Sequence, residues 1–131
     1  MKIILTLTLA ACFFAPALLR AENIVYPAGA GVLDVTKAPY NADPTGAADS
    51  TAALQSALND DVGSRQILYF PNGTYRISST LTVPLTRGGS VQYGFTHLQG
   101  QSQAGVVIRL QDGAFPDAGS PKPLLTFGPH N

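Results

Sequence analysis

The segment Asn41–Ile77 joins a polar turn, a short helical stretch and an apolar strand in a fixed order, and it constrains the fold more than any other part of the chain. Asp49, Ser50 and Thr51 carry side-chain oxygens that can accept hydrogen bonds from the free amides at a helix start. The residues that follow, Ala52–Asn59, are rich in helix formers. The sequence therefore predicts one helix that begins at this polar turn.

The predicted helix has a single narrow apolar face. Leu54, Ala57 and Leu58 fall at positions i, i+3 and i+4, so their side chains lie on one side, and this side must cover another apolar surface. Gly63 can end the helix with a positive φ. The polar residues of the same stretch are expected to face away: Gln55, Ser56 and Asn59.

Short strands are predicted after the helix. Ile67–Phe70 is a continuous apolar run, which is typical of a strand buried on both faces. Apolar residues then alternate with polar ones at Tyr75, Ile77, Leu81, Val83 and Leu85. Further strands, bounded by Gly, Pro, Ser or Asp, are expected at Val91–Tyr93, His97–Gln99, Val106–Leu110 and Leu124–Phe127.

Two all-β architectures fit one helix followed by many short strands. An antiparallel sandwich or barrel would use Asn72-Gly73 as a tight hairpin turn. A parallel β-helix would coil successive strands into rungs, and its open apolar end would need a cover such as the helix that carries Leu54.

The first 21 residues have the pattern of a secretory signal peptide. Lys2 precedes the uncharged run Ile3–Leu19, and small residues stand at Ala15, Ala17 and Ala21. We therefore expect residues 1–21 to be removed and residues 22–131 to be secreted, periplasmic or on the cell surface. Seventeen uncharged residues interrupted by Pro16 are short for a membrane span. The lipobox-like ending at Cys12 makes a lipid anchor a secondary alternative.

Composition excludes several classes of function. Charged residues make up 12% of the chain, with eight basic and eight acidic side chains and no Lys/Arg cluster, so a nucleic-acid surface has no support. The single cysteine, Cys12, lies in the predicted leader, so no disulfide is expected. His97 and His130 are far apart in sequence and no thiol accompanies them, so we expect no metal ligands in this chain.

The motifs of this chain resemble the pectate lyase superfamily, specifically the N-terminal segment of the rhamnogalacturonase/epimerase-like right-handed parallel β-helix proteins. Residues 41–58, NADPTGAADSTAALQSAL, look like the family's "GDG-x-x-DDTAAIQAAI" opening. Residues 67–77, ILYFPNGTYRI, are similar to "V-x-F-P-x-G-x-Y-x-I". Residues 98–102 with 107–110 look like "L-x-G-x-G/S…T-x-I-x-L". Pro44-Thr45, Ser50 and Val107 depart from these patterns and loosen the subfamily assignment.

The resemblance implies an incomplete solenoid, with an N-terminal cap helix and about the first two rungs of a right-handed parallel β-helix. It also implies a groove that binds a polysaccharide, either a pectin-like uronan or a glucan, and cleavage by lyase or hydrolase chemistry. A full-length lyase would use calcium and a base, and a hydrolase would use two carboxylates. In such enzymes these groups lie on middle rungs, so we expect no catalytic residue and no cofactor here.

The titratable residues of the chain have plain structural explanations. Asp60 and Asp61 are expected to be a solvated helix end, because neighbouring helix residues point apart. Asp112 and Asp117 lie in a Gly/Pro-rich loop where turn chemistry suffices. His97 is expected to be a structural histidine. His130 lies too close to the terminus for any interpretation.

Four other features of the sequence bear on binding. Arg76 and Arg109 lie within strands and could meet a uronate carboxylate on an outer face, although such positions are usually only solvated. Asp43 and Asp49 match the family motif, and turn and cap roles explain both. The other two features fail as binding motifs: Gly29-Ala30-Gly31 lacks the third glycine of a dinucleotide loop, and the sequon Asn72-Gly73-Thr74 is explained by its turn.

We therefore expect the N-terminal portion of a secreted carbohydrate-active β-helix protein, and we expect the 131-residue chain alone to be inactive. Its expected partners are a polysaccharide and, at the C-terminal end, further β-helix rungs or a partner chain, because repeat folds need at least about three units to bury a core. The alternatives are a non-catalytic carbohydrate-binding or surface module, or a truncated inactive fragment.

Overall fold

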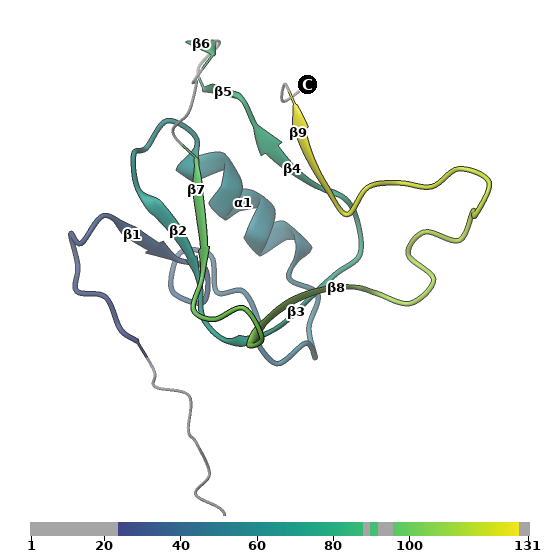
Figure 1. Ribbon diagram of the computed structural model, residues 1–131, viewed down its shortest axis with the longest axis horizontal. Coiled ribbons are helices and arrows are strands. Elements are labelled where there is room, and N and C mark those ends of the chain that lie inside the picture. The colour runs from purple at the N-terminus through teal and green to yellow at the C-terminus, as the bar shows by residue number, and fades with distance from the viewer. Residues whose placement is uncertain (1–23, 88–89, 92–95, 129–131) are drawn as a thin grey trace, which may run out of the picture.

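A computed structural model describes residues 24–87, 90–91 and 96–128 of the chain (Figure 1). The described elements comprise one helix and nine short strands, which do not close into a barrel. In chain order they are β1 (Val32–Asp34), α1 (Thr51–Asp61), β2 (Ile67–Phe70), β3 (Gly73–Ile77), β4 (Leu81–Pro84), β5 (Thr86–Arg87), β6 (Ser90–Val91), β7 (His97–Gly100), β8 (Val106–Leu110) and β9 (Leu125–Gly128).

Parallel pairing between two successive passes of the chain organises these strands. β2, β3 and β4 belong to three different sheets, and they pair in parallel with β7, β8 and β9 respectively. β1 pairs in parallel with the other edge of β2, and β5 pairs with β6 in a small antiparallel ribbon. The chain therefore makes two stacked turns, with one strand of each turn in each sheet (Figure 1).

The core lies between the inner faces of the three sheets. Leu68, Tyr75 and Ile77 are fully buried, as is Val83 of β4. The rings of Phe70 and Tyr75 meet edge to face, with centroids 5.9 Å apart. Burying one such side chain contributes about 1.5–3 kcal/mol. Among the described strands, the buried apolar side chains belong to β2, β3 and β4, so the first turn supplies most of the apolar stabilisation.

Helix α1 lies across this core, as its apolar face predicts. Leu54, Ala57 and Leu58 are buried in the same cluster as the inner residues of the strands. In Figure 1 the helix lies between β2 and β7 on one side and β4 and β9 on the other. The chain leaves the helix through Gly63 at φ 66°, which agrees with the sequence prediction.

On the side of α1, the backbone groups at the strand edges of the first turn form hydrogen bonds with the helix and with the loop that precedes it. The side-chain amide of Gln55 donates to the Thr82 carbonyl at 2.7 Å and accepts from the Thr82 amide at 2.9 Å, as a neighbouring strand would. The expectation that Gln55 faces away from the core was therefore wrong. On β3, the Thr74 amide donates to the Pro44 carbonyl at 2.7 Å. The first turn is thus closed on this side.

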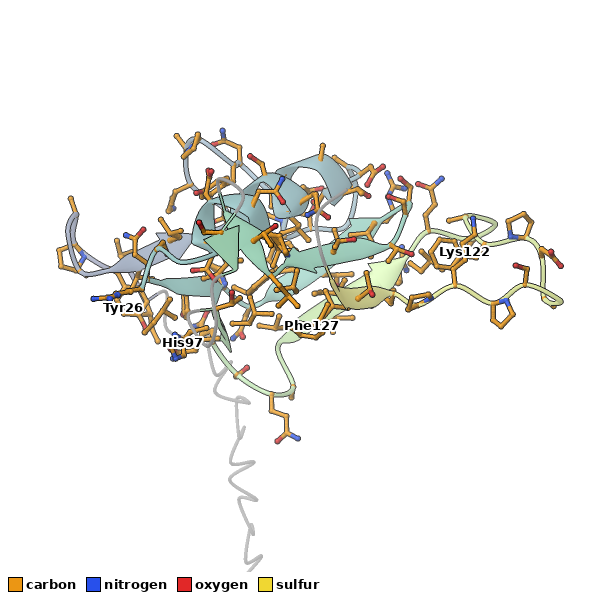
Figure 2. The ribbon with its side chains drawn as sticks, turned by 90° about the horizontal axis from the view of Figure 1, so that it is seen from above. Tyr26, His97, Lys122 and Phe127 are labelled. Carbon is orange, nitrogen blue, oxygen red and sulfur yellow. The ribbon has the colours of Figure 1, made fainter. Side chains whose placement is uncertain are left out.

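The second turn is open on the opposite side. Leu98 and Phe127 are 40% and 63% exposed, whereas the residues directly beneath them in register, Leu68 and Val83, are 0% exposed. Figure 2 shows His97 and Phe127 on the side that faces away from α1. An apolar row of the inner surface therefore meets solvent in these 131 residues.

The structure agrees with some of the predicted strands and differs from others. β2 and β8 have the predicted bounds, and β9 begins one residue later than expected. The hairpin at Asn72-Gly73 is not formed, because β2 and β3 join different sheets. The predicted strand at Val91–Tyr93 runs beyond the described residues, and the predicted leader, residues 1–21, lies wholly outside them.

Among the residues that the structure describes, no helix is both long and apolar enough to cross a membrane.

Candidate functional site

Two arginines lie side by side on the outer face of β3 and β8. Tyr75 and Ile77 point into the core, so Arg76 between them points outward. In β8 the exposed residues are Val107 and Arg109. Arg76 and Arg109 are register partners in the parallel pair, so their side chains are neighbours on one face.

The Arg76 side chain is held by the loop that precedes α1. Its Nη2 donates to the Ala47 carbonyl at 2.5 Å, and its backbone forms a parallel bridge with Asp49. Within the described part of the chain, the buried Nε of Arg76 has no hydrogen-bond partner. The guanidinium is therefore fixed in position with part of its donor capacity unused.

Arg109 is more accessible. It is exposed, and within residues 24–87, 90–91 and 96–128 no hydrogen bond or ion pair engages its guanidinium. Like charges directly opposite each other in a sheet are destabilising. The arrangement is therefore a small cationic site in which one guanidinium is anchored and the other is available.

Asp49 lies on the other side of Arg76, and both oxygens of its carboxylate already accept hydrogen bonds. Its Oδ1 accepts from the Thr51 amide at 2.9 Å, and its Oδ2 accepts from the Ser78 hydroxyl at 2.6 Å. The Ser78 hydrogen bond and then the Thr51 hydrogen bonds hold the pKa of this carboxyl below its ordinary value, and the Arg76 charge adds to them. Asp49 is therefore ionised at neutral pH and serves the helix start. Ser50, by contrast, makes no side-chain cap there.

Asp43 shapes the turn before the helix. Its carboxylate accepts from the Thr45 amide at 2.9 Å and from the Ala48 amide at 2.6 Å. These hydrogen bonds, that of Ala48 first, lower the pKa of Asp43 to about 2. The hydrogen bonds of Asp43 and Asp49 confirm the turn and cap roles that their positions indicate.

Asp60 and Asp61 point apart, and only one of them is solvated. Asp60 is exposed and accepts a hydrogen bond from the Tyr40 hydroxyl at 3.1 Å. Burial and then this hydrogen bond raise the pKa of Tyr40 to about 12. Asp61 is fully buried, so the expectation of a solvated helix end was wrong for this residue. Its surroundings include Ser64, whose hydroxyl donates at 3.3 Å, and His97.

Burial dominates the chemistry of Asp61. It raises the pKa of the carboxyl, and the Ser64 hydroxyl and the backbone and imidazole of His97 oppose the rise. Within the described chain, Oδ2 of Asp61 has no hydrogen-bond partner. The structure thus brings a buried carboxyl close to His97, which is exposed on β7. No local sequence signal could show this, because the two residues are far apart in the chain.

The remaining candidates do not gather into a site. Asp117 accepts a hydrogen bond from the Gly119 amide at 2.8 Å in the exposed loop between β8 and β9, and Asp112 lies exposed in the same loop. His130 is outside the described residues. The side-chain oxygen of Asn72, the first residue of the sequon, accepts from the Ser102 hydroxyl at 2.8 Å. That contact ties the second turn to the first.

A surface cavity of about 420 Å³ lies beside β1, and sequence reasoning did not anticipate it. Its lining comes from 25–29, 32–34 and 37–40 and includes Tyr26, Asp34, Lys37 and Tyr40. The ring of Tyr26 also packs edge-on against Tyr69, with centroids 4.9 Å apart, which covers the outer face of β2. The cavity therefore forms where the N-terminal segment folds over the first sheet.

Calcium, which a full-length lyase would use, binds several carboxylates at once. In the described ranges, no three His, Cys, Asp or Glu side chains come together, whereas calcium takes six to eight oxygen ligands with several carboxylates among them.

Comparison with known proteins gives the family. The family model Rhamnogalacturonase A/epimerase, pectate lyase-like, matches residues 35–120. The chain belongs to this family. The resemblance carried by its motifs is therefore confirmed.

Two further similarities cover parts of larger proteins. Alpha-1,3-galactosidase A of Peterkaempfera griseoplana is 47% identical over 61 residues, which make up 45% of this chain and 8% of that protein. The solved structure of ORF18 of Geobacillus virus E2 superposes with a TM-score of 0.50 at 23% identity, over 76% of this chain and 18% of that one. The viral protein shows a shared fold and nothing about activity. The family member described here thus spans only a small share of either relative.

Proposed function

We propose that residues 22–131 form the N-terminal part of a secreted, carbohydrate-active, right-handed parallel β-helix protein. The observation that carries this proposal is the in-register stacking of β7, β8 and β9 on β2, β3 and β4. Each sheet receives one strand per turn, as a coil of rungs requires. In this proposal α1 is the cap helix of the first rung, which its burial over the core supports.

The open side of the second turn supports continuation of the coil. Among the described residues no further strand pairs with the outer edges of β7, β8 and β9. These edges and the half-exposed inner row at Leu98 and Phe127 fit a further parallel rung. Such a rung would bury this row as the second turn buries the first. We propose that the partner of this face is the rest of the same β-helix.

The proposed substrate is a polysaccharide that is cleaved by lyase or hydrolase chemistry. The family supports a uronan, and the partial similarity to an alpha-1,3-galactosidase supports a galactose-containing glycan. A glycoside hydrolase needs two accessible carboxyl groups, one of them protonated. Asp43 and Asp49 are held ionised by turn hydrogen bonds, and Asp61 is buried. Asp60 and Asp117 are exposed but already accept hydrogen bonds, from the Tyr40 hydroxyl and the Gly119 amide respectively. We propose that the catalytic groups lie outside this segment.

Export is part of the same proposal. The charged start, apolar run and small residues of 1–21 support a cleaved signal peptide, and delivery to the periplasm, the cell surface or the medium follows from it. A lipid anchor at Cys12 is the secondary alternative.

The test is the intact mass of the protein secreted by its native source, detected with an antibody against residues 74–85. We expect a species several times heavier than the 13.7 kDa of these 131 residues, and it should release products from a uronan or a galactan. New reducing ends with an unsaturated sugar would identify a lyase, and reducing ends alone would identify a hydrolase. A secreted species slightly lighter than 13.7 kDa would contradict the proposal.

A further inference from the structure

We propose that Asn72-Gly73 is a site of spontaneous deamidation, and that the stacking of the second turn on the first controls whether the reaction takes place. Asn72 lies at the corner between β2 and β3, and Gly73 is the first residue of β3. No other asparagine of the sequence precedes a glycine. Because glycine has no Cβ, its amide nitrogen can approach the preceding side chain with little steric hindrance. The inference goes beyond the proposed function and does not depend on it.

The reaction consumes only water, and asparagine is the thermolabile residue in it. The amide nitrogen of Gly73 attacks Cγ of Asn72, and the side-chain nitrogen leaves as ammonia with the proton that Gly73 loses. In the cyclic succinimide that results, the Gly73 nitrogen is bonded to both carbonyl carbons of Asn72. Water then breaks one of these bonds. Opening at Cγ gives aspartate, and opening at the main-chain carbon gives isoaspartate, in which the backbone runs through the side chain.

In the folded chain the attacking group is engaged by the second turn. The Gly73 amide donates to the Gly105 carbonyl at 2.8 Å, so its proton is held and its nitrogen is fixed at the start of β3. A hydrogen-bonded backbone amide becomes reactive only when local opening breaks that hydrogen bond. The nucleophile is therefore blocked for as long as Gly105 stays in place on the first turn.

The side chain under attack is held by the same loop, residues 101–105, which joins β7 to β8 beside the corner between β2 and β3 (Figure 1). Oδ1 of Asn72 accepts from the Ser102 hydroxyl at 2.8 Å, and this hydroxyl accepts from the Gly105 amide at 3.0 Å. The Asn72 amide donates to Oε1 of Gln101 at 2.9 Å. A Cβ added at Gly105 would overlap the Asn72 carboxamide, so this side chain packs directly against the loop backbone. One loop thus fixes both reacting groups.

The isoaspartate product cannot restore the same stack. β2 and β3 pair in register with β7 and β8, and isoaspartate adds one carbon atom to the backbone at the corner between β2 and β3. A longer corner disturbs at least one of the two pairings, because each is fixed residue by residue. The aspartate product keeps the backbone length and adds one negative charge. The site therefore records in covalent form that the second turn has left the first.

The experiment follows the tryptic peptide of residues 66–76 by mass spectrometry while the full chain is incubated at mildly alkaline pH. Exchange of the amide for an acid changes the mass, and chromatography separates the isoaspartate form from the aspartate form. A synthetic peptide of the same residues in the same buffer gives the unprotected rate. We expect the folded chain to deamidate at least about tenfold more slowly than this peptide, because only molecules with an open loop react.

Ser102→Ala is the test variant, because it removes one hydrogen bond to Asn72 and one from Gly105. We expect it to raise the rate in the folded chain about fivefold, as the loss of hydrogen bonds of ordinary strength predicts. Ser120→Ala, in the exposed loop between β8 and β9, is the matched control and should react at the parent rate. If circular dichroism shows that Ser102→Ala is unfolded, Gln101→Met takes its place, because it removes the acceptor of the Asn72 amide.

Each other result overturns a defined part of the inference. A free peptide that does not deamidate would overturn the site itself. A folded chain that reacts as fast as the peptide would overturn protection by the second turn. A protected chain in which the folded test variant reacts no faster than Ser120→Ala would assign the protection to the fold as a whole and overturn the role of the loop.

Discussion

Gly73 lies where β3 passes closest to the loop that precedes α1. A Cβ added there would stand 2.5 Å from the Pro44 carbonyl oxygen and 2.6 Å from the Pro44 Cβ. The same approach lets the Thr74 amide reach that carbonyl. Glycine is therefore required at this position by close packing of two backbones, and the turn that its sequence context predicts plays no part.

We expect Gly73→Ala to lower the free energy of unfolding by about 1–3 kcal/mol, because the backbone must shift to admit the methyl group. Gly128→Ala is the matched control, since a Cβ there meets no atom within 4 Å. Urea unfolding followed by far-ultraviolet circular dichroism measures both. Equal stability of the two variants would contradict the close approach of β3 to Pro44.

The buried carboxyl of Asp61 makes the stability of the fold depend on pH. Burial raises its pKa in the folded state above the ordinary value of 3.8, so the ionised form destabilises the fold. This penalty is absent below the unfolded pKa, appears as the pH rises towards the folded pKa, and persists above it. Asp61→Asn removes the charge while its side-chain oxygen can still accept from Ser64.

The stability of Asp61→Asn relative to the parent protein should therefore be more favourable at pH 7 than at pH 4. Thermal unfolding at both pH values measures this difference, and the contributions of Asp43 and Asp49 cancel because both proteins contain them. Asp112→Asn, in an exposed loop, is the matched control for the loss of one carboxyl group. A difference that is constant with pH would exclude the raised pKa.

At the scale of elements, one side chain of α1 forms hydrogen bonds with the backbone of β4. Gln55 donates to and accepts from the backbone of Thr82 at 2.7 and 2.9 Å. We expect Gln55→Ala to cost about 1–3 kcal/mol of unfolding free energy, because two backbone groups at the strand edge lose their partners. Ser56→Ala, exposed on the same helix, should change stability by less than about 0.5 kcal/mol in the same urea titration. If the two variants have equal free energies of unfolding, water replaces the two hydrogen bonds of Gln55 without loss of stability.

The elements show which parts of the structure local patterns can predict. The bounds of β2 and β8 and the buried face of α1 follow from runs and spacings of apolar residues, which depend on neighbours in sequence. The roles of Gln55 and Asp61 depend on partners 27 and 36 residues away, at Thr82 and His97, and no local pattern contains them.

Local sequence patterns also fail to predict the strand pairing and the candidate site. Asn72-Gly73 is a strong hairpin signal, but tertiary packing against Pro44 and Gly105 sends β2 and β3 into different sheets. Both arginines could be recognised in the sequence as outward strand residues. Their adjacency follows from parallel pairing between β3 and β8, which only the stacking of two turns produces.

At the scale of the whole molecule, the two sides of the stacked turns differ. On the side of α1, β1, Gln55 and the loop at Pro44 satisfy the strand edges. On the other side, the inner row of the second turn is half-exposed and the edges of β7, β8 and β9 have no further strand among the described residues. Exposed apolar surface of this kind marks an association site.

The 131-residue polypeptide should therefore bind the dye ANS and self-associate as its concentration rises, because the open inner row excludes water poorly. Replacing both Leu98 and Phe127 by Thr should reduce the dye fluorescence and the association seen by sedimentation velocity, since these inner-row side chains are 40% and 63% exposed. Val107→Thr is the control, because Val107 is similarly exposed at 45% but lies on the outer face. If Val107→Thr reduces dye binding as much as the double variant does, the open end is not the source of the association. If only the double variant does so, the exposed inner row of the second turn is the surface through which the polypeptide associates.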